Sequence, residues 1–367
     1  MQKHQVITAA IHEFLGGAYL RSQTETLVAC VLGLMTGGEI SLTSIGRHLP
    51  GDIDAKHKIK RVDRFCANDR IGLGPLTTQM LLALAGESRS VVISVDWTSL
   101  DDFACLTFAV STQHGRAIPV YWEVVDPKQE RTKAVEVEAV KRFHRLVPQE
   151  VNVVILADRG FDEVKFIAAV AKHFQYVIRL SKGNTISNTA PVQRFMTLAS
   201  SLTVRDEVVD FGDVLFTEAN KFRTRVIGKH ARKSVDPWFL ATNLEKPAKT
   251  IVTLYAYRFD IEHAFKDWKD VYHGWQLGSI RSKSPQRLAR LLMVPAIAFL
   301  LLVLLGLHAE SQKLHRGLQV NSVKNKRCLC LWRVGVLIFT TLRRLPVRTA
   351  KALLRFVDGL TLQPEVC

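Results

Sequence analysis

Two aspartates stand at the ends of apolar runs: Asp96 in VVISVDWTS and Asp158 in VVILADRGF. A carboxylate there costs free energy unless it is paired or binds a cation. Each has an ordinary interpretation alone, because Asp158 could be a turn residue and Asp96 could satisfy nearby backbone groups. On neighbouring strands, however, the two together predict a Mg²⁺ site.

A third acid, Glu262, lies in a helical segment far along the chain. Tyr255, Arg258, Glu262 and Lys269 stand at offsets 0, 3, 7 and 14, which places them within an arc of about 60° on one helix. At about 1.5 Å per residue, Tyr255 and Lys269 each lie roughly 10 Å from Glu262 along the axis. Only Glu262 can therefore join the two aspartates, and the other three would flank it as phosphate ligands. An ordinary solvated stripe remains the alternative.

The elements that position these residues alternate in type. Strands are predicted at Ser90–Val95, Cys105–Thr112 and Ala117–Val125, then a helix at Lys133–Val147, a strand at Val151–Ala157, a helix at Asp162–Phe174 and a strand at Tyr176–Leu180. A helix-linked return normally makes the later strands parallel to the first. This order predicts an α/β fold with the mixed sheet of ribonuclease H, flanked by helices.

Residues 182–249 interrupt that alternation. Short strands are predicted at Thr203–Asp210, Asp213–Glu218, Arg223–Ile227 and Trp238–Thr242, and they indicate an inserted β-rich subdomain. Helical periodicity resumes at Thr250 and continues nearly to the C-terminus.

The first 75 residues are predicted to be helical. Ser41 caps a short helix in SLTSIGRHLP, and KHKIKRVDRF follows in a pattern that resembles a helix-turn-helix. A solvated basic face is the alternative interpretation. The candidate DNA contacts are Arg47, Lys56, Lys58, Lys60, Arg61 and Arg64.

Composition narrows the class of protein. The 367 residues carry a formal charge of +16, which indicates a polyanionic partner, either nucleic acid or an acidic membrane. Six scattered cysteines without a C-x-x-C pair predict free thiols in a reducing compartment. No Walker or G-x-G-x-x-G motif follows a strand, which disfavours ATP and dinucleotide enzymes. The uncharged run Leu291–Leu307 is predicted to be a buried core helix, with a single membrane span as the alternative.

Taken together, these motifs resemble those of a known family. SVDWTS, ILADRGF and the Y-x-x-R-x-x-x-E-x-x-x-x-x-x-K string are similar to those of DDE transposases of bacterial cut-and-paste insertion sequences, specifically the insertion-sequence-four family. LTSIGRHLP, KHKIKRVDRF, DPWFLATNL and NSVKNKRCL extend the resemblance over nearly the whole chain.

The resemblance implies roles for particular residues. Asp96, Asp158 and Glu262 would hold two Mg²⁺ ions, with Mn²⁺ as a substitute, and Tyr255, Arg258 and Lys269 would grip the transposon end. Trp238 would stack on a flipped base, although packing in the core is the alternative. Phe259 is a second aromatic residue of the signature.

The resemblance also implies an organisation and an activity. Residues 1–75 would bind transposon-end DNA, 88–181 and 250–310 would form the catalytic core, 182–249 the insertion, and 311–367 a helical region for dimerisation or DNA contacts. The protein would excise an insertion sequence and join its 3′ ends to target DNA, through a hairpin. Its partners would be double-stranded DNA, both the inverted repeats and the target, and a second copy of the chain when it is assembled on DNA. It would act in the bacterial cytoplasm, at the nucleoid, and would not bind a membrane. A catalytically silent DNA-binding inhibitor derived from a transposase is the alternative.

Overall fold

The structure is a computed structural model. It describes residues 2–189, 194–201, 206–230, 236–277, 282, 284–318, 326–346, 348, 350–357 and 360.

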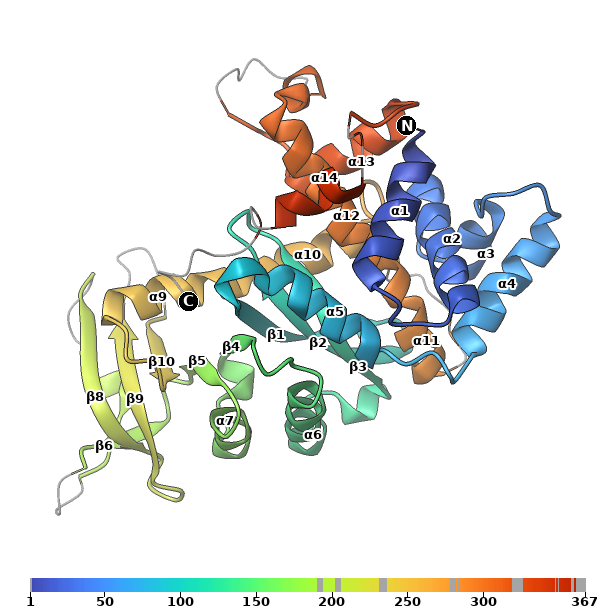
Figure 1. Ribbon diagram of the computed structural model, residues 1–367. Helices are drawn as coiled ribbons and strands as arrows, with labels where there is room; N and C mark the ends of the chain where they lie inside the picture. Colours follow the sequence, from blue (N-terminus) through green and yellow to red (C-terminus); the bar gives the residue numbers. More distant parts are fainter. Residues whose placement is uncertain are drawn as a thin grey trace.

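Ten strands form one mixed sheet that runs from the centre of the molecule to one end, in the order β3-β2-β1-β4-β5-β10-β9-β8-β6-β7 (Figure 1). β1 pairs antiparallel with β2 and parallel with β4, and β4 pairs parallel with β5. The predicted mixed α/β fold of the ribonuclease H type is therefore confirmed. The core strands are β1 (Ser90–Leu100), β2 (Phe103–Ser111), β3 (Ala117–Val125), β4 (Asn152–Ala157) and β5 (Gln175–Leu180).

β1 runs five residues further than predicted. The sequence indicated an end at Val95, but Asp96 and the residues after it continue to pair with β2, as far as Leu100 opposite Phe103. The apolar run marks only the part of the strand that is buried on both faces, and the pairing continues beyond it. Asp96 therefore stands within a strand, next to the point where β4 ends.

The strands after residue 182 extend the same sheet beyond β5. They are β6 (Thr185–Ser187), β7 (Met196–Thr197), β8 (Val208–Phe216), β9 (Phe222–Lys229) and β10 (Trp238–Thr242). β10 pairs antiparallel with β5 and thereby joins the two parts. Two of the predicted short strands are one strand, β8, with an irregularity between Asp210 and Gly212. Thr203 lies outside the described residues.

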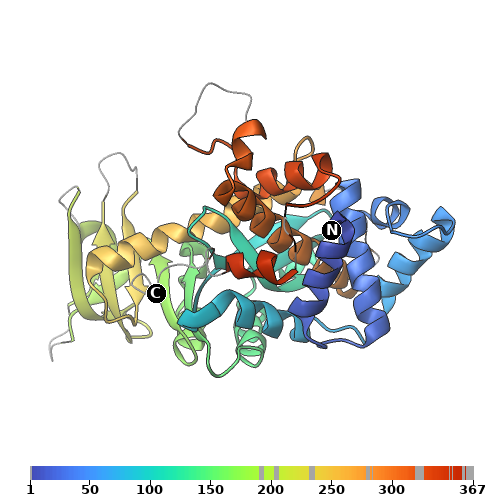
Figure 2. The ribbon, with the colours of Figure 1, turned by 45° about the horizontal axis from the view of Figure 1, so that its top comes forward.

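Helices cover both faces of the sheet. α6 (Lys133–His144) and α7 (Val164–Ala171) lie side by side on one face (Figure 1). On the other face, α9 (Ala248–Ala256), the 3₁₀ turn η4 (Tyr257–Phe259) and α10 (Asp260–Lys269) follow one another as a nearly continuous rod (Figure 2). The prediction of one unbroken helix through this segment was wrong, because the tighter turn η4 interrupts it.

Two of the predicted helices are shorter than expected. α6 ends at His144, and α7 begins at Val164 after the 3₁₀ turn η3 (Arg159–Phe161). Asp162 precedes the helix, and its carboxylate accepts hydrogen bonds from Ser181 N and Asn184 Nδ2.

The N-terminal region is helical, as predicted. Its elements are α1 (Lys3–Leu15), α2 (Arg21–Gly37), α3 (Leu42–Arg47), α4 (Ala55–Ala67) and α5 (Gly74–Ala85). Ser41 Oγ accepts a hydrogen bond from Ser44 N, which confirms the predicted cap. Glycine at position 46 lets α3 and α4 approach closely, because a Cβ there would lie 2.6 Å from Ile59 Cα.

The apolar run forms a core helix rather than an exposed one. α11 (Pro285–Leu291) leads into α12 (Met293–Ser311), and α13 (Leu331–Thr341) and α14 (Ala350–Leu354) pack nearby. Residues 285–311 are long and apolar enough to cross a membrane, but their most apolar window is 89% buried inside the protein. The helix thus lies in the core, as predicted. Among the described cysteines, Cys30, Cys66, Cys105 and Cys330 are free thiols, and Cys367 lies outside the described residues.

Candidate active site

Asp96 and Asp158 come together because they follow paired positions of neighbouring parallel strands. Val95 of β1 is in register with Ala157 of β4. Asp96 Oδ1 accepts a hydrogen bond of 2.8 Å from the next backbone N–H, and Asp158 Oδ1 accepts one of 2.8 Å from Gly160 N. Each carboxylate is thus held by its own local backbone, with one oxygen left for other partners.

Glu262 reaches the same place from α10. Arg258 Nη1 lies 2.7 Å from Glu262 Oε1 and 4.0 Å from Asp96 Oδ2, so the guanidinium stands between the two acids. Burial raises the pKa of Asp96 to about 6, and the negative charges of Asp158 and Glu262 add to that increase. The Arg258 charge opposes it. The three predicted acids therefore share one electrostatic environment.

The donor chemistry of this cluster suits a hard divalent cation. Carboxylate oxygens are preferred ligands of Mg²⁺, and one arginine does not neutralise three acids. Within the part of the chain that the structure describes, no three acidic, histidine or cysteine side chains are already arranged as a cation cage. The Glu262 carboxylate is turned toward Arg258 instead. Half of the Glu262 side chain is exposed, which leaves it room to turn toward the aspartates.

The other residues of the four-residue signature differ in exposure. Tyr255 is 1% and Arg258 5% exposed, whereas Lys269 is half-buried. Burial lowers the pKa of Lys269, while the charge of Asp96 acts in the opposite direction. The alternative of an ordinary solvated stripe is therefore wrong for Tyr255 and Arg258, because a helical wheel does not reveal which neighbouring element covers a face.

An aromatic cluster borders the acids. The Trp238 ring, at the start of β10, lies 5.0 Å from the Tyr255 ring and 6.1 Å from the Phe259 ring, measured between centroids. The guanidinium carbon of Arg258 lies 4.1 Å from the centre of the Phe259 ring. Trp238 is only half-buried, so part of its ring surface is open to solvent. The cluster thus connects the end of the insertion to Arg258.

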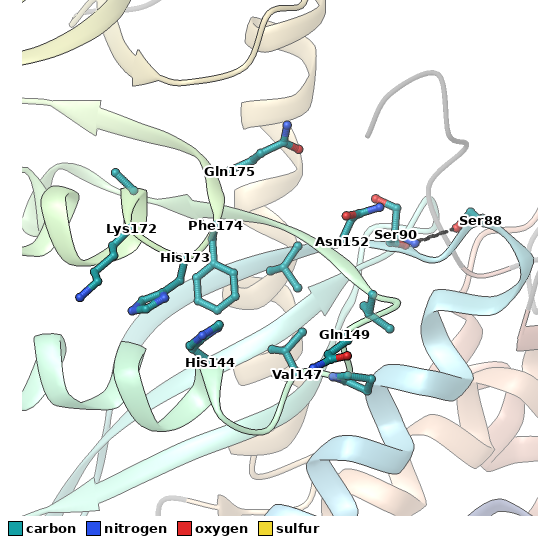
Figure 3. A pocket seen from close by; sticks show the side chains of 14 residues that line it. Ser88, Ser90, His144, Val147, Gln149, Asn152, Lys172, His173, Phe174 and Gln175 are labelled. Atoms are coloured by element: carbon teal, nitrogen blue, oxygen red, sulfur yellow. Dashed lines mark hydrogen bonds between the residues drawn. The ribbon is translucent and has the colours of Figure 1, made fainter.

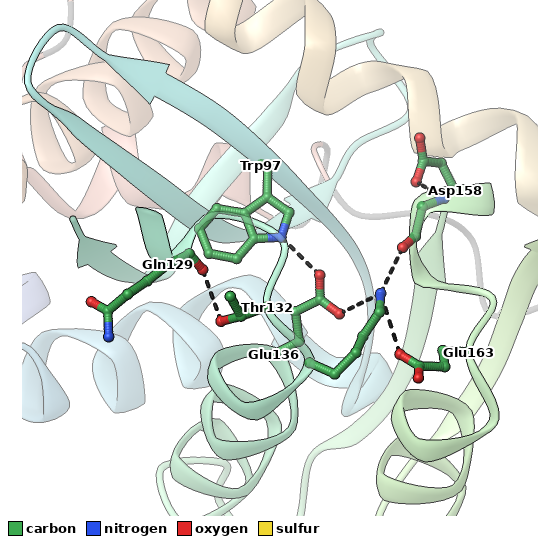
Figure 4. Close-up of polar contacts among 8 residues, drawn as sticks. Trp97, Gln129, Thr132, Glu136, Asp158 and Glu163 are labelled. Carbon is green, nitrogen blue, oxygen red and sulfur yellow. Dashed lines mark hydrogen bonds and ion pairs between the residues drawn. The ribbon is translucent and has the colours of Figure 1, made fainter. Parts of the chain in front are cut away.

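Two charged residues in contact with this region were missed by sequence reasoning. Lys133 and Glu136 of α6 link the segments that carry the two aspartates (Figure 4). Val135 and Val137 are only half-buried, whereas Glu136 between them is fully buried. The spacing could have indicated that Glu136 is buried, because it stands four residues before Val140 on the buried side of the helix.

The basic side chains of the N-terminal region lie apart from the acids, on α3 and α4 at one end of the molecule (Figure 1). Arg47, Lys56, Lys60 and Arg64 are exposed. Lys58 and Arg61 are half-buried, and Arg61 donates to Thr26 Oγ1 through Nε and Nη2. Lys56, Lys60 and Arg64 follow one another at intervals of four and so form one solvent-facing row on α4.

A separate hollow lies at the opposite end of the parallel strands (Figure 3). Stacked rings of His144 and His173, 3.9 Å apart, stand on its wall beside Phe174. Its lining includes the first residues of β1, β4 and β5 and contains no carboxylate. The acids therefore lie outside this hollow, at the other end of the strands.

Comparison with known proteins gives one family. The family model of the transposase DDE domain matches residues 106–301. The matched stretch contains Asp158 and Glu262 and begins after Asp96. No curated protein matches the sequence.

Proposed function

The chain belongs to the transposase DDE domain family, and from this membership we propose that it cuts an insertion sequence out of flanking DNA and joins the 3′ ends to target DNA. The observation that carries the proposal is the position of Arg258 Nη1 within 4.0 Å of both Asp96 and Glu262, beside a strand end where Asp158 follows in register. Three acids remote in sequence thus meet at one end of the sheet.

Asp96, Asp158 and Glu262 would hold two Mg²⁺ ions, for which Mn²⁺ would substitute. When bound, such ions lower the pKa of an attacking water or 3′-OH and stabilise the departing oxygen. The chain itself orients the acids through Trp97 N and Gly160 N. Arg258 of η4 supplies positive charge between two of them, and Lys269 adds a cation at the end of α10.

We further infer membership of the insertion-sequence-four family. Support comes from the succession of Tyr255, Arg258, Glu262 and Lys269 along one rod and from the contact of Trp238 with Tyr255. Stacking of Trp238 on a flipped base would accommodate the sharp bend of a hairpin intermediate. Phe259, which is next to Trp238, would widen this stacking surface.

The proposed partners are double-stranded inverted repeats, target DNA and a second copy of the chain on DNA. Residues 1–75 would bind the ends through the exposed row on α4 and Arg47, since exposed cations attract phosphates. Residues 88–181 and 250–310 would form the catalytic core, 182–249 the insertion, and 311–367 would serve assembly or DNA contacts. The site of action would be the bacterial cytoplasm, at the nucleoid.

The test uses DNA that flanks the gene, because that DNA contains the candidate ends. Asp96→Asn, Asp158→Asn and Glu262→Gln should each abolish Mg²⁺-dependent nicking and leave end binding within about twofold, since only charge is removed. Asp101→Asn, in the exposed turn after β1, is the matched control and should nick normally. A parent chain that binds the ends without nicking them would instead identify a catalytically silent inhibitor.

A further inference from the structure

Glu136 is a fully buried acid whose two carboxylate oxygens are both engaged. Oε1 accepts a hydrogen bond of 3.0 Å from the indole Nε1–H of Trp97, and Oε2 accepts one of 2.9 Å from Lys133 Nζ. A buried charge must be paired and hydrogen-bonded to be tolerated. Glu136 meets that condition with one partner from β1 and one from its own helix.

Lys133 carries the network across to the segment after β4 (Figure 4). Its Nζ donates a hydrogen bond of 2.9 Å to Gly160 O and lies 4.0 Å from Glu163 Oε2. The ammonium group thus bridges α6 to the turn that follows Asp158. Its three donors suit such a junction of oxygens.

The two ends of this network lie one and two positions along the chain from the proposed metal ligands, at Trp97 after Asp96 and at Gly160 after Asp158. The backbone N–H of Trp97 donates to Asp96, and the backbone N–H of Gly160 donates to Asp158. Successive side chains of a strand point to opposite faces. Trp97 therefore reaches α6 on one face, while Asp96 faces Arg258 on the other.

Stability alone does not explain why Lys133 and Glu136 form a charged pair here. Apolar side chains of similar volume are often as stabilising as a buried ion pair, because both charges lose their hydration. What apolar side chains could not do is hydrogen-bond two separate segments at once. The contacts of Lys133 and Glu136 reach both segments, at the positions where each aspartate is oriented.

We propose that Lys133 and Glu136 are positioning residues that set the separation of Asp96 and Asp158 for divalent cations. The proposal rests on the proposed function, since it concerns the same acids. Residues that hydrogen-bond metal ligands typically change metal affinity 10- to 100-fold when they are removed, and Lys133 and Glu136 act on the two aspartates through Trp97 and Gly160. The expected effect is therefore on cation binding, with the DNA-binding helices unaffected.

The experiment measures Mn²⁺ binding to the full chain by the electron paramagnetic resonance signal of free Mn²⁺. The double variant Lys133→Met/Glu136→Gln removes both charges together and so leaves no unpaired buried ion. We expect about 10- to 100-fold weaker Mn²⁺ binding. The Mg²⁺ concentration for half-maximal nicking should rise in parallel, with metal-free end binding unchanged. The matched control is Lys141→Met/Glu138→Gln, a solvent-exposed pair of the same types on α6 with its charges 3.7 Å apart.

Unchanged Mn²⁺ affinity in the double variant, with binding abolished by Asp96→Asn, would overturn the positioning role and leave the proposed function intact. A parent chain that binds no Mn²⁺ would overturn the proposed metal site and this inference together. Should circular dichroism show that the double variant is unfolded, Trp97→Phe decides. It removes the N–H that donates to Glu136 together with part of the buried indole ring, and equal Mn²⁺ affinity would then overturn the proposal.

Discussion

Arg258 is bonded to Glu262 one helical turn further along, with Nη1 2.7 Å from Oε1. The same nitrogen lies 4.0 Å from Asp96 Oδ2. Because Arg258 is almost fully buried, its charge is poorly hydrated, and its ion-pair partners are Glu262 and Asp96. The guanidinium therefore lies where positive charge reduces the repulsion between carboxylates.

Arg258→Lys should reduce nicking by roughly tenfold or more, equivalent to about 1.4 kcal/mol of barrier. A lysine keeps the charge but offers one compact ammonium in place of a planar fork that reaches two acids. Single-turnover nicking of end DNA measures the effect. Arg142→Lys, in an exposed pair with Glu123, is the control and should nick normally. Normal nicking by Arg258→Lys would show that charge alone suffices.

Trp238→Ala should impair hairpin formation more than first-strand nicking. The ring lies against Tyr255 and Phe259 rather than among the acids, so its loss removes a stacking surface of about 1–3 kcal/mol per base without touching the carboxylates. Quantifying nicked and hairpin products on one gel separates the two steps. Trp238→Phe should retain most hairpin formation. Equal loss of both steps by the alanine variant would indicate that Trp238 serves packing instead.

Sequence patterns predicted the core strands because burial on both faces demands apolar, β-branched runs. Asp96 and Asp158 stood out for the same reason, since a charge ending such a run is costly. Which strands pair with one another was harder to predict from the sequence. Nothing in the local sequence shows that β10 pairs with β5 and merges the insertion with the main sheet.

The burial of polar side chains on helices was also not predicted from the sequence. The pattern at Tyr255 and Arg258 identified a common helix face but not that β10 and Phe259 cover it. Glu136 was passed over because valines on either side of it suggested the apolar stripe. Its burial depends on Trp97 and Lys133 as partners, which are contacts set by the tertiary fold.

The row on α4 can be tested through the salt dependence of DNA binding. Each lost phosphate contact lowers the slope of log K against log salt by about 0.9, so alanine at Lys56, Lys60 and Arg64 should lower it by up to about 2.7. Fluorescence anisotropy with end DNA from low to moderate salt measures the slope. The control removes three other exposed cations, which lie on or beside α6 and α7: Lys141, Lys165 and Lys172. Equal slope changes in both triples would indicate net charge rather than a local interface.

Asp260→Asn should flatten the pH dependence of stability. Burial raises the pKa of Asp260 to about 7, although a backbone N–H from Thr112 and the charge of Arg116 oppose the increase. A carboxyl whose pKa is raised on folding binds more protons in the folded state, so stability falls as pH rises from about 4 to about 7. The asparagine variant lacks this loss. Relative to the parent, its free energy of unfolding should rise over that window by at most about 4 kcal/mol.

Urea unfolding at several pH values between 4 and 8.5 measures this difference. The informative quantity is how the difference in unfolding free energy changes with pH. Its absolute value is less informative, because the amide also alters the buried environment of Oδ2, which accepts no hydrogen bond from the described residues. Glu150→Gln, at an exposed position after α6, controls for the loss of one acid. A difference in unfolding free energy between Asp260→Asn and the parent that stays constant at all pH values would show that Asp260 ionises normally. The first residue of α10 would then be a charged carboxylate rather than a protonated one.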